Sequence, residues 1–258
     1  MPLVDVQREG ALARIWFDRP ESHNALNAEV GRELTVALHA LAEDATCRVV
    51  VLGGRGPSFS AGADIGAMKA SAGASFEQNL AEAETLAGVF AALGDFPKPV
   101  VGRAHGNVFG GGVGFVCCCD IVVASDDAKF GLTEVRLGIL PGIISPYVIR
   151  RLGDRWAREF MLTGERFGAA EAHRIGLVHH VVPMAELDAK VDERVGELLK
   201  GGPEAQKRVK RLLELWGDVG WEEYRSALPR TLAEVRSGDE AKDGLSAFFE
   251  KRSPKWTA

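Results

Sequence analysis

The stretch FGGGVGFVCCCD, residues 109–120, places three consecutive glycines ahead of three consecutive cysteines. Such a stretch could form a phosphate loop, a metal site, or a backbone segment that comes very close to a ligand. The spacing argues against a phosphate loop, because the chain contains no GxxxxGK(S/T) motif. It also places Phe115 where the pattern GxGxxG, begun at Gly110, requires glycine. The sequence therefore does not predict a nucleotide fingerprint here.

The three glycines lie between two apolar segments. KPVVGRAHG, residues 98–106, predicts a strand, and VGFVCCC, residues 113–119, predicts a buried helix. Glycines at such a junction let the backbone approach a ligand and expose N–H groups at the positive end of a helix. A second glycine-rich turn, SFSAGADI at residues 58–65, also follows a predicted strand. Two backbone N–H groups that converge on one carbonyl oxygen would form an oxyanion hole.

The cysteines and histidines favour no metal site or nucleophile. Adjacent residues on a helix point about 100° apart, so the cysteine triplet at 117–119 cannot converge on one zinc ion, and together with Cys47 it makes no disulfide framework. Buried small side chains in a reducing compartment are expected instead. His105 lies beside the expected oxyanion hole, but no GxSxG motif accompanies it, so a serine hydrolase is not expected.

The order of the predicted elements indicates an α/β protein. Residues 11–17, 48–54, 120–125 and 128–132 predict strands, and residues 76–93 predict an amphipathic helix that ends near Gly94. Strands that alternate with helices favour an α/β core with covered faces. From about Pro203 the pattern is helical alone, so we divide the chain into a core of residues 1–200 and a C-terminal helical region of residues 201–258.

Composition and charge narrow the function classes. The net charge is −5, and the 31 Lys and Arg residues are dispersed, which argues against nucleic-acid binding. No window reaches the roughly 18 apolar residues of a membrane span, and no N-terminal stretch combines a basic start with an apolar run. A cytoplasmic protein without a membrane partner is expected.

Several motifs together resemble the crotonase, or enoyl-CoA hydratase/isomerase, superfamily. The resemblance runs from about residue 11 to residue 251 and implies a spiral of ββα units followed by a C-terminal helical trimerisation region, usually in a trimer or a dimer of trimers. It implies an acyl-CoA thioester substrate, with coenzyme A entering only as part of that substrate and with no other cofactor. The motifs are RPESHNALN (19–27), SFSAGADI (58–65), HGNVFGGGVG (105–114), CDIVVAS (119–125), AKFGLTEVRLGILPG (128–142), MLTGERFGAAEAHRIGLV (161–178) and AFFEKR (247–252).

The resemblance also implies roles for individual residues. The backbone N–H groups of Ala63 and Gly111 would form the oxyanion hole. Phe248 and Lys251 would reach the nucleotide end of coenzyme A from a neighbouring subunit. The remaining implied coenzyme A contacts fall on two turns, one from His23 to Ala25 and the other at Ala61, Ala63, Asp64 and Ile65.

At the catalytic carboxylates the chain departs from the family pattern. Hydratases of the superfamily carry two glutamates; the second aligns with Glu134, whereas the first falls on Gly114. We expect Glu134 to act as the general acid/base. One glutamate is compatible with hydration of the 2,3 double bond, with 3,2-enoyl-CoA isomerisation by Glu134 alone, and with a non-catalytic acyl-CoA-binding protein.

Finer details resemble the bacterial methylglutaconyl-CoA and carboxygeranoyl-CoA hydratases, and we therefore favour hydration. The segment PGIISPYVIRRLG, residues 141–153, replaces the common PGGGGTQRL and predicts a different wall of the acyl pocket. A carboxylated acyl chain would need a cationic partner, for which Arg136, Arg150 and Arg151 are candidates.

Overall fold

A six-stranded sheet forms the centre of the computed structural model, which describes residues 2–257. The two strands at one edge are antiparallel and the others are parallel. Long parallel strands with both faces covered are expected to be apolar throughout, and β3 is buried at all six positions. In spatial order the strands are β1 (Val4–Glu9), β2 (Leu12–Phe17), β3 (Val49–Gly54), β4 (Val100–Ala104), β6 (Ile121–Ser125) and β9 (His180–Val182).

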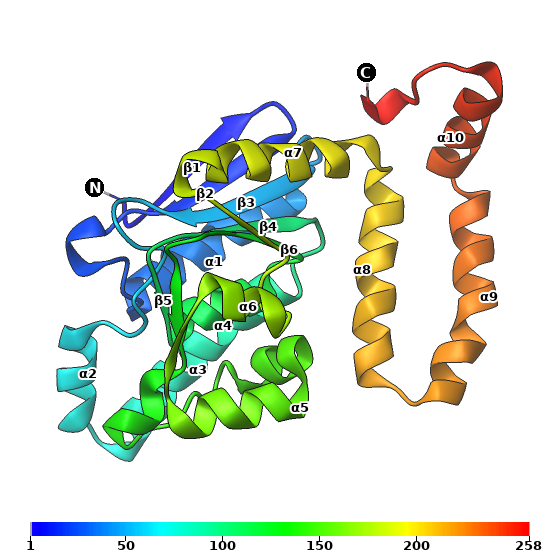
Figure 1. The fold of residues 1–258 in the computed structure, drawn as a ribbon. Helices are drawn as coiled ribbons and strands as arrows, with labels where there is room; N and C mark the ends of the chain where they lie inside the picture. Colours follow the sequence, from blue (N-terminus) through cyan, green and yellow to red (C-terminus); the bar gives the residue numbers. More distant parts are fainter. Residues whose placement is uncertain (1, 258) are drawn as a thin grey trace.

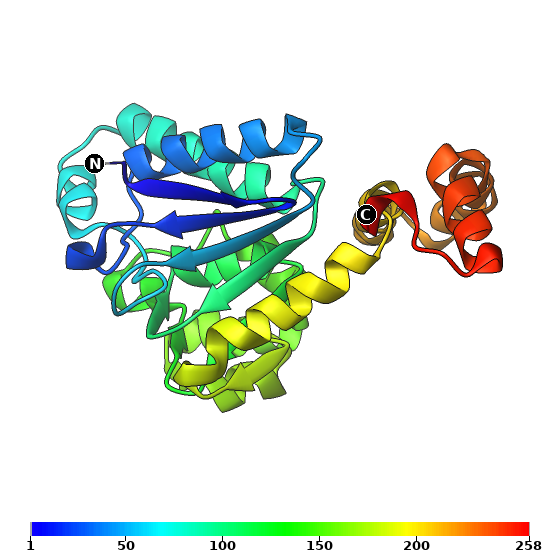
Figure 2. The same cartoon turned by 90° about the horizontal axis from the view of Figure 1, so that it is seen from above.

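Alternate residues of these strands face two different layers of helices. Val49 and Val51 of β3 pack with the apolar side of α7 (Leu187–Lys200), whereas Val50 and Leu52 pack on the opposite face. That opposite face is covered by α1 (Ala28–Glu43) and α3 (Phe76–Gly94), as Figure 2 shows. The sheet is therefore sandwiched between helices, which confirms the predicted α/β class.

A second, three-stranded sheet positions the glycine-rich turn. Its order is β5 (Asn107–Phe109), β7 (Lys129–Gly131) and β8 (Arg166–Gly168), and β5 runs parallel to β7. Both parallel strands lead directly into the segments of interest. The chain leaves β5 into α4 (Gly111–Cys118) and leaves β7 into η2, a 3₁₀ helix at Thr133–Leu137.

The remaining helices of the core are shorter or lie at its periphery. Asn27 begins α1 by accepting hydrogen bonds from the N–H groups of Glu29 and Val30, as its sequence position predicts. No helix among residues 2–257 is long and apolar enough to cross a membrane. The other elements of the core are η1 (Pro20–Ser22), α2 (Ile65–Ala72), α5 (Ser145–Thr163), α6 (Ala169–Arg174) and η3 (Met184–Glu186).

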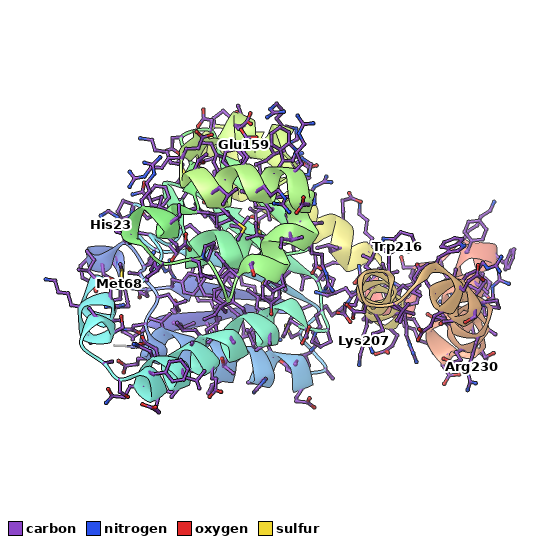
Figure 3. The ribbon with its side chains drawn as sticks, turned by 90° about the horizontal axis from the view of Figure 1, so that it is seen from below. His23, Met68, Glu159, Lys207, Trp216 and Arg230 are labelled. Carbon is purple, nitrogen blue, oxygen red and sulfur yellow. The ribbon has the colours of Figure 1, made fainter. Side chains whose placement is uncertain are left out.

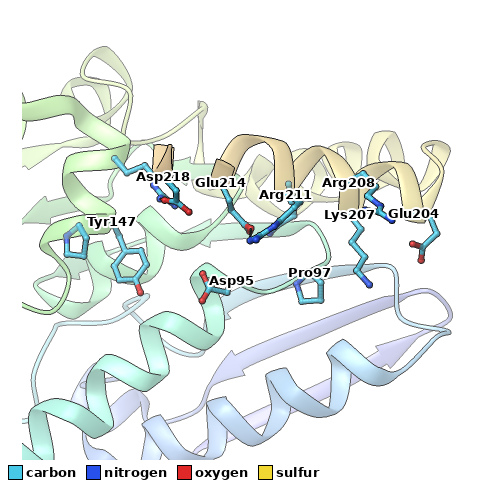
Figure 4. Close-up of a pocket in the computed structure, with 12 residues that line it drawn as sticks. Asp95, Pro97, Tyr147, Glu204, Lys207, Arg208, Arg211, Glu214 and Asp218 are labelled. Carbon is cyan, nitrogen blue, oxygen red and sulfur yellow. Dashed lines mark hydrogen bonds and ion pairs between the residues drawn. The ribbon is translucent and has the colours of Figure 1, made fainter. Parts of the chain in front are cut away.

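The C-terminal helices stand apart from this core (Figure 1). They are α8 (Pro203–Asp218), α9 (Trp221–Ser237) and α10 (Asp239–Glu250), followed by η4 (Lys255–Thr257). Helices α8 and α9 contain no buried residue, and Trp216 and Phe248 are 58% and 77% exposed. An open groove lined mainly by charged side chains separates α8 from the core, with Tyr147 and Asp95 on the core side (Figure 4).

Candidate functional site

The two glycine-rich turns predicted from the sequence lie against each other. The Ser60 N–H donates to the Asn107 carbonyl (3.1 Å), and the Phe109 N–H donates to the Ser60 carbonyl (3.0 Å). A Cβ atom placed on Gly62 would lie 3.0 Å from the Phe109 carbonyl oxygen and 3.7 Å from Gly110 Cα. The segments that carry Ala63 and Gly111 are therefore brought together across about 50 residues of sequence, as an oxyanion hole requires.

The Ala63 N–H is left free by the geometry of its neighbours. Leu26 and Ala63 form an isolated parallel bridge, in which the Leu26 N–H donates to the Gly62 carbonyl (2.7 Å) and the Asp64 N–H donates to the Leu26 carbonyl (2.9 Å). In such a bridge the central residue directs its own N–H away from the partner segment. Within residues 2–257 the Ala63 N–H donates to no acceptor.

Among the described residues the Gly111 N–H also has no acceptor, because of its place in α4. Gly111 is the first residue of that helix, and the first N–H groups of a helix have no acceptor within it. Gly110, which precedes it, has φ 49° and ψ −117°, a conformation accessible only to glycine. Gly112 also needs to be glycine, because a Cβ atom there would lie 2.5 Å from the Ser60 carbonyl oxygen.

Glu134 is the carboxylate at this junction. It lies in η2, which ends at Gly138 in the left-handed conformation (φ 73°), and its Oε1 would be 3.0 Å from a Cβ atom on Gly110. Its Oε2 is buried and has no hydrogen-bond partner among the described residues. Burial raises the pKa of the Glu134 carboxyl above its ordinary value of 4.5. A half-buried carboxyl with a raised pKa is suited to proton transfer.

Gly114, the position to which the family resemblance assigns another glutamate, is enclosed by apolar side chains. A Cβ atom on Gly114 would lie 2.4 Å from Ile144 Cγ2 and 2.8 Å from Phe90 Cε1. Ile144 is 4% exposed, and Phe90 stacks on Phe115 with ring centroids 4.7 Å apart. The site therefore holds no second carboxylate at this position, and sequence reasoning did not identify Ile144 as the residue that fills the space.

The implied coenzyme A turn at residues 23–25 is held beside the Ala61–Ala63 segment. His23 adopts the left-handed conformation (φ 53°), its Nδ1 lies 2.9 Å from Ser58 Oγ, and its carbonyl accepts a hydrogen bond from the Ala61 N–H (2.9 Å). The neighbouring Asn24 is 2% exposed and donates to the Ser58 carbonyl. His23, Ala25, Ala61 and Ala63 are thus gathered by tertiary contacts.

Asp64 and Ile65 continue the same surface. Asp64 caps α2 by accepting from the N–H groups of Gly66 (2.7 Å) and Ala67 (3.2 Å). Burial would raise the Asp64 pKa, but its hydrogen bonds, the one from Arg19 first among them, leave the pKa below the ordinary value. Ile65 begins α2 and is 71% exposed.

Phe248 and Lys251 do not join this group within one chain. Both lie on or just after α10, where Phe248 is exposed and Lys251 ends the helix in the left-handed conformation. Figure 3 shows His23 and Met68 at one end of the molecule and Trp216 and Arg230, in the C-terminal helices, at the other.

Two of the three arginines considered for a carboxylated acyl chain have other partners. Arg151 donates to the carbonyls of Val116, Cys117 and Cys119 at the end of α4, and Arg150 pairs with Asp218 of α8 (2.8 Å). Arg136 follows Glu134 by two residues and makes one hydrogen bond, to the Thr163 carbonyl (3.3 Å).

The remaining sequence candidates have structural roles. The imidazole of His105 is buried and contacts the Arg103 guanidinium (3.1 Å) and the Gly56 carbonyl (2.9 Å), rather than any group of the oxyanion turns. Burial raises the pKa of both Cys117 and Cys119 to about 12, which favours the protonated thiol over the nucleophilic thiolate. Across residues 2–257 no group of three or more His, Cys, Asp or Glu side chains could hold a metal ion.

Fold and site together define an α/β protein that presents two unpaired backbone amides beside one half-buried carboxylate, the class of site that stabilises an oxyanion during proton transfer. The chain belongs to the enoyl-CoA hydratase/isomerase family, whose profile matches residues 7–258.

Relatives of similar identity act on different acyl groups. The chain is 33% identical to the short-chain-enoyl-CoA hydratase of Clostridium acetobutylicum, covering 96% of this chain and 95% of that protein. It is 30% identical to the hydroxycinnamoyl-CoA hydratase-lyase of Pseudomonas fluorescens, covering 98% and 94%. The crystal structure of an enoyl-CoA hydratase from Shewanella pealeana superposes with a TM-score of 0.94 at 38% identity, covering 98% of this chain and 96% of that one.

Proposed function

We propose that this protein is an enoyl-CoA hydratase that adds water across the 2,3 double bond of an enoyl-CoA thioester. The observation that carries the proposal is the meeting of three groups from two glycine-rich turns and η2. These are the unpaired N–H groups of Ala63 and Gly111 and the half-buried carboxylate of Glu134. Family membership supports the same reaction class.

In this mechanism the thioester oxygen accepts hydrogen bonds from the Ala63 and Gly111 N–H groups. Negative charge that develops on this oxygen as the enolate forms is stabilised by donors already in place. The Glu134 carboxylate accepts a proton from water as the water attacks C3, and a proton is then delivered to C2 from the same locus. We propose no cofactor besides the coenzyme A that forms part of the substrate.

The apolar surroundings of Gly114 support a second candidate, a 3,2-enoyl-CoA isomerase. Ile144 and Phe90 occupy the space from which a second carboxylate would extend. A single carboxylate can take a proton from C2 and return it to C4, so isomerisation needs no second acid or base. A third possibility, acyl-CoA binding without catalysis, predicts binding with no turnover.

For the acyl group we propose a short branched chain that carries a carboxylate, such as 3-methylglutaconyl-CoA. Arg136 is the remaining candidate cation, because Arg150 and Arg151 are engaged by Asp218 and by the carbonyls at the end of α4. This substrate would place the enzyme in leucine breakdown, and we propose a cytoplasmic location.

A product assay in ¹⁸O-labelled water tests the function. Wild-type protein is expected to convert 3-methylglutaconyl-CoA, and more slowly crotonyl-CoA, to 3-hydroxyacyl-CoA that carries the label. Double-bond migration in 3-enoyl-CoA without label uptake would establish the isomerase instead. Binding of every thioester without conversion would contradict both enzymatic proposals.

We also propose that the protein is a homotrimer or a dimer of trimers in which Phe248 and Lys251 complete the coenzyme A site of a neighbouring subunit. The exposed aromatic side chains of α8 and α10 support this assembly, since large apolar patches are uncommon on monomers. Sedimentation equilibrium is expected to give three or six times the 27.7 kDa chain mass. A stable monomer with full affinity for acyl-CoA would contradict the shared site.

A further inference from the structure

Arg19 connects the two segments that meet beside the Ala63 N–H. Its Nη1 donates to the Ala25 carbonyl (2.8 Å), and its Nη2 donates to Asp64 Oδ2 (2.9 Å). We propose that Arg19 is a positioning residue that holds the Ala63 N–H in line with the thioester oxygen. This inference rests on the proposed function.

The two segments meet through several bonds on the N-terminal side of Ala63. The Ala61 N–H donates to the His23 carbonyl and Ser60 Oγ donates to the Asn24 carbonyl, ahead of the isolated bridge at Leu26 and Ala63. Ala25 directly precedes Leu26, and Asp64 directly follows Ala63. The Arg19 guanidinium therefore binds the two segments next to the Leu26–Ala63 bridge. Beyond Ala63, the bond from the Asp64 N–H to the Leu26 carbonyl is joined by the bond from Arg19 to the Asp64 carboxylate. A planar fork that binds both segments limits how far the backbone at Ala63 can rotate.

Arg19 and Asp64 are each held in place by further hydrogen bonds. The Arg19 N–H donates to Asn24 Oδ1 (2.8 Å), and the Arg19 carbonyl accepts from the Asn24 N–H (2.9 Å). At the other end, Asp64 Oδ1 is held by the Gly66 N–H at the start of α2. The side chains of Arg19 and Asp64 are only 16% and 18% exposed, so water screens the pair less than it screens a surface ion pair.

Alignment matters because an oxyanion donor acts only when it is aimed at the developing charge. Deviations of more than about 0.5 Å or 10–20° weaken a catalytic constellation. Lysine carries the same charge as arginine but lacks the planar fork, so it cannot hold Ala25 and Asp64 in one fixed geometry. The positioning role of Arg19 therefore depends on the shape of its guanidinium as well as on its charge.

The test compares Arg19→Lys and Arg19→Met with Arg8→Met. Arg8 is a matched control, because it also joins a backbone carbonyl (Gly10, 3.2 Å) to a carboxylate (Asp44, 3.0 Å), but between the β1–β2 turn and the end of α1. Each variant is assayed for kcat and KM. Each is also titrated with a slowly reacting aryl-enoyl-CoA, whose absorbance shifts to longer wavelength when its carbonyl is polarised. Circular dichroism gives the folded fraction to which both readings are normalised.

Both Arg19 variants are expected to lower kcat by about 10-fold or more, a part of the 10²–10³-fold that one oxyanion donor contributes. KM is expected to change less than kcat, and the absorbance shift of the bound thioester should shrink, while Arg8→Met retains wild-type values. If folded Arg19→Lys protein keeps the wild-type kcat and the wild-type absorbance shift, the role proposed for Arg19 is wrong, and the proposed function still stands. A wild-type protein that neither turns over nor shifts the chromophore would overturn the proposed function as well.

Discussion

Replacing Glu134 with glutamine is expected to lower kcat for hydration by about 10²–10⁴-fold, the range typical of a general acid/base. Glutamine has nearly the same shape as glutamate, so thioester binding through the Ala63 and Gly111 N–H groups should persist and KM should change little. Stopped-flow loss of the conjugated enoyl thioester absorbance measures the effect. The matched control is Glu159→Gln on the exposed face of α5, which is expected to retain full activity.

The activity of the wild-type enzyme should depend on pH through the ionisation of Glu134. Burial raises the pKa of this carboxyl above 4.5, and the base must be deprotonated to accept a proton from water. Activity is therefore expected to rise with pH, with a midpoint above the ordinary pKa of glutamate. The residual activity of Glu134→Gln should not show this rise. Full activity in Glu134→Gln would contradict the assignment.

The same substitution is expected to stabilise the fold at neutral pH. A carboxyl whose pKa is raised in the folded state contributes stability that is fully present below the unfolded pKa and is lost as the pH rises through the folded pKa. Glu134 thus weakens the wild-type fold where it is ionised, and glutamine does not. The urea midpoint of Glu134→Gln should be higher than that of the wild-type protein at pH 8, and the two midpoints should coincide near pH 3.5. Equal midpoints at pH 8 would argue against a desolvated carboxylate.

Gly112→Ala is expected to produce the second large loss, through the oxyanion hole. The added Cβ would lie 2.5 Å from the Ser60 carbonyl oxygen, which is backbone and accepts a hydrogen bond from Phe109. The backbone at Gly112 must shift, and Gly111 directly precedes Gly112. Misplacing one oxyanion donor lowers kcat by about 10²–10³-fold. Overpacking of this kind also destabilises proteins by about 1–3 kcal/mol.

Kinetics and thermal unfolding of Gly112→Ala are compared with those of Gly196→Ala. Gly196 lies in α7, and a Cβ atom placed there would meet no atom within 4 Å. That control should keep full activity and gain up to about 1 kcal/mol of stability, since alanine favours helix over glycine. If Gly112→Ala retains wild-type kcat, the close approach of the two turns is not needed for catalysis.

Much of the fold follows from local patterns in the sequence. The apolar run at residues 48–54 corresponds to β3, the amphipathic segment at residues 76–93 corresponds to α3, and Asn27 caps α1. These features are readable because side-chain direction repeats along a strand or helix and because caps act within a few residues. The predicted strand at residues 128–132 corresponds to β7. The strands β5 and β8 are harder to predict, because three residues hold too little periodicity and their pairing is set by partners distant in sequence.

The sequence by itself determined the family motifs, the α/β class and Glu134 as the candidate acid/base, because each is encoded in a short run of residue types. Tertiary structure alone decided that Ile144 fills the space beside Gly114, that Arg19 reaches Asp64, and that Glu134 is desolvated. These outcomes depend on distances between segments many residues apart. Such distances are fixed by core packing and chain crossings, and no local pattern records them.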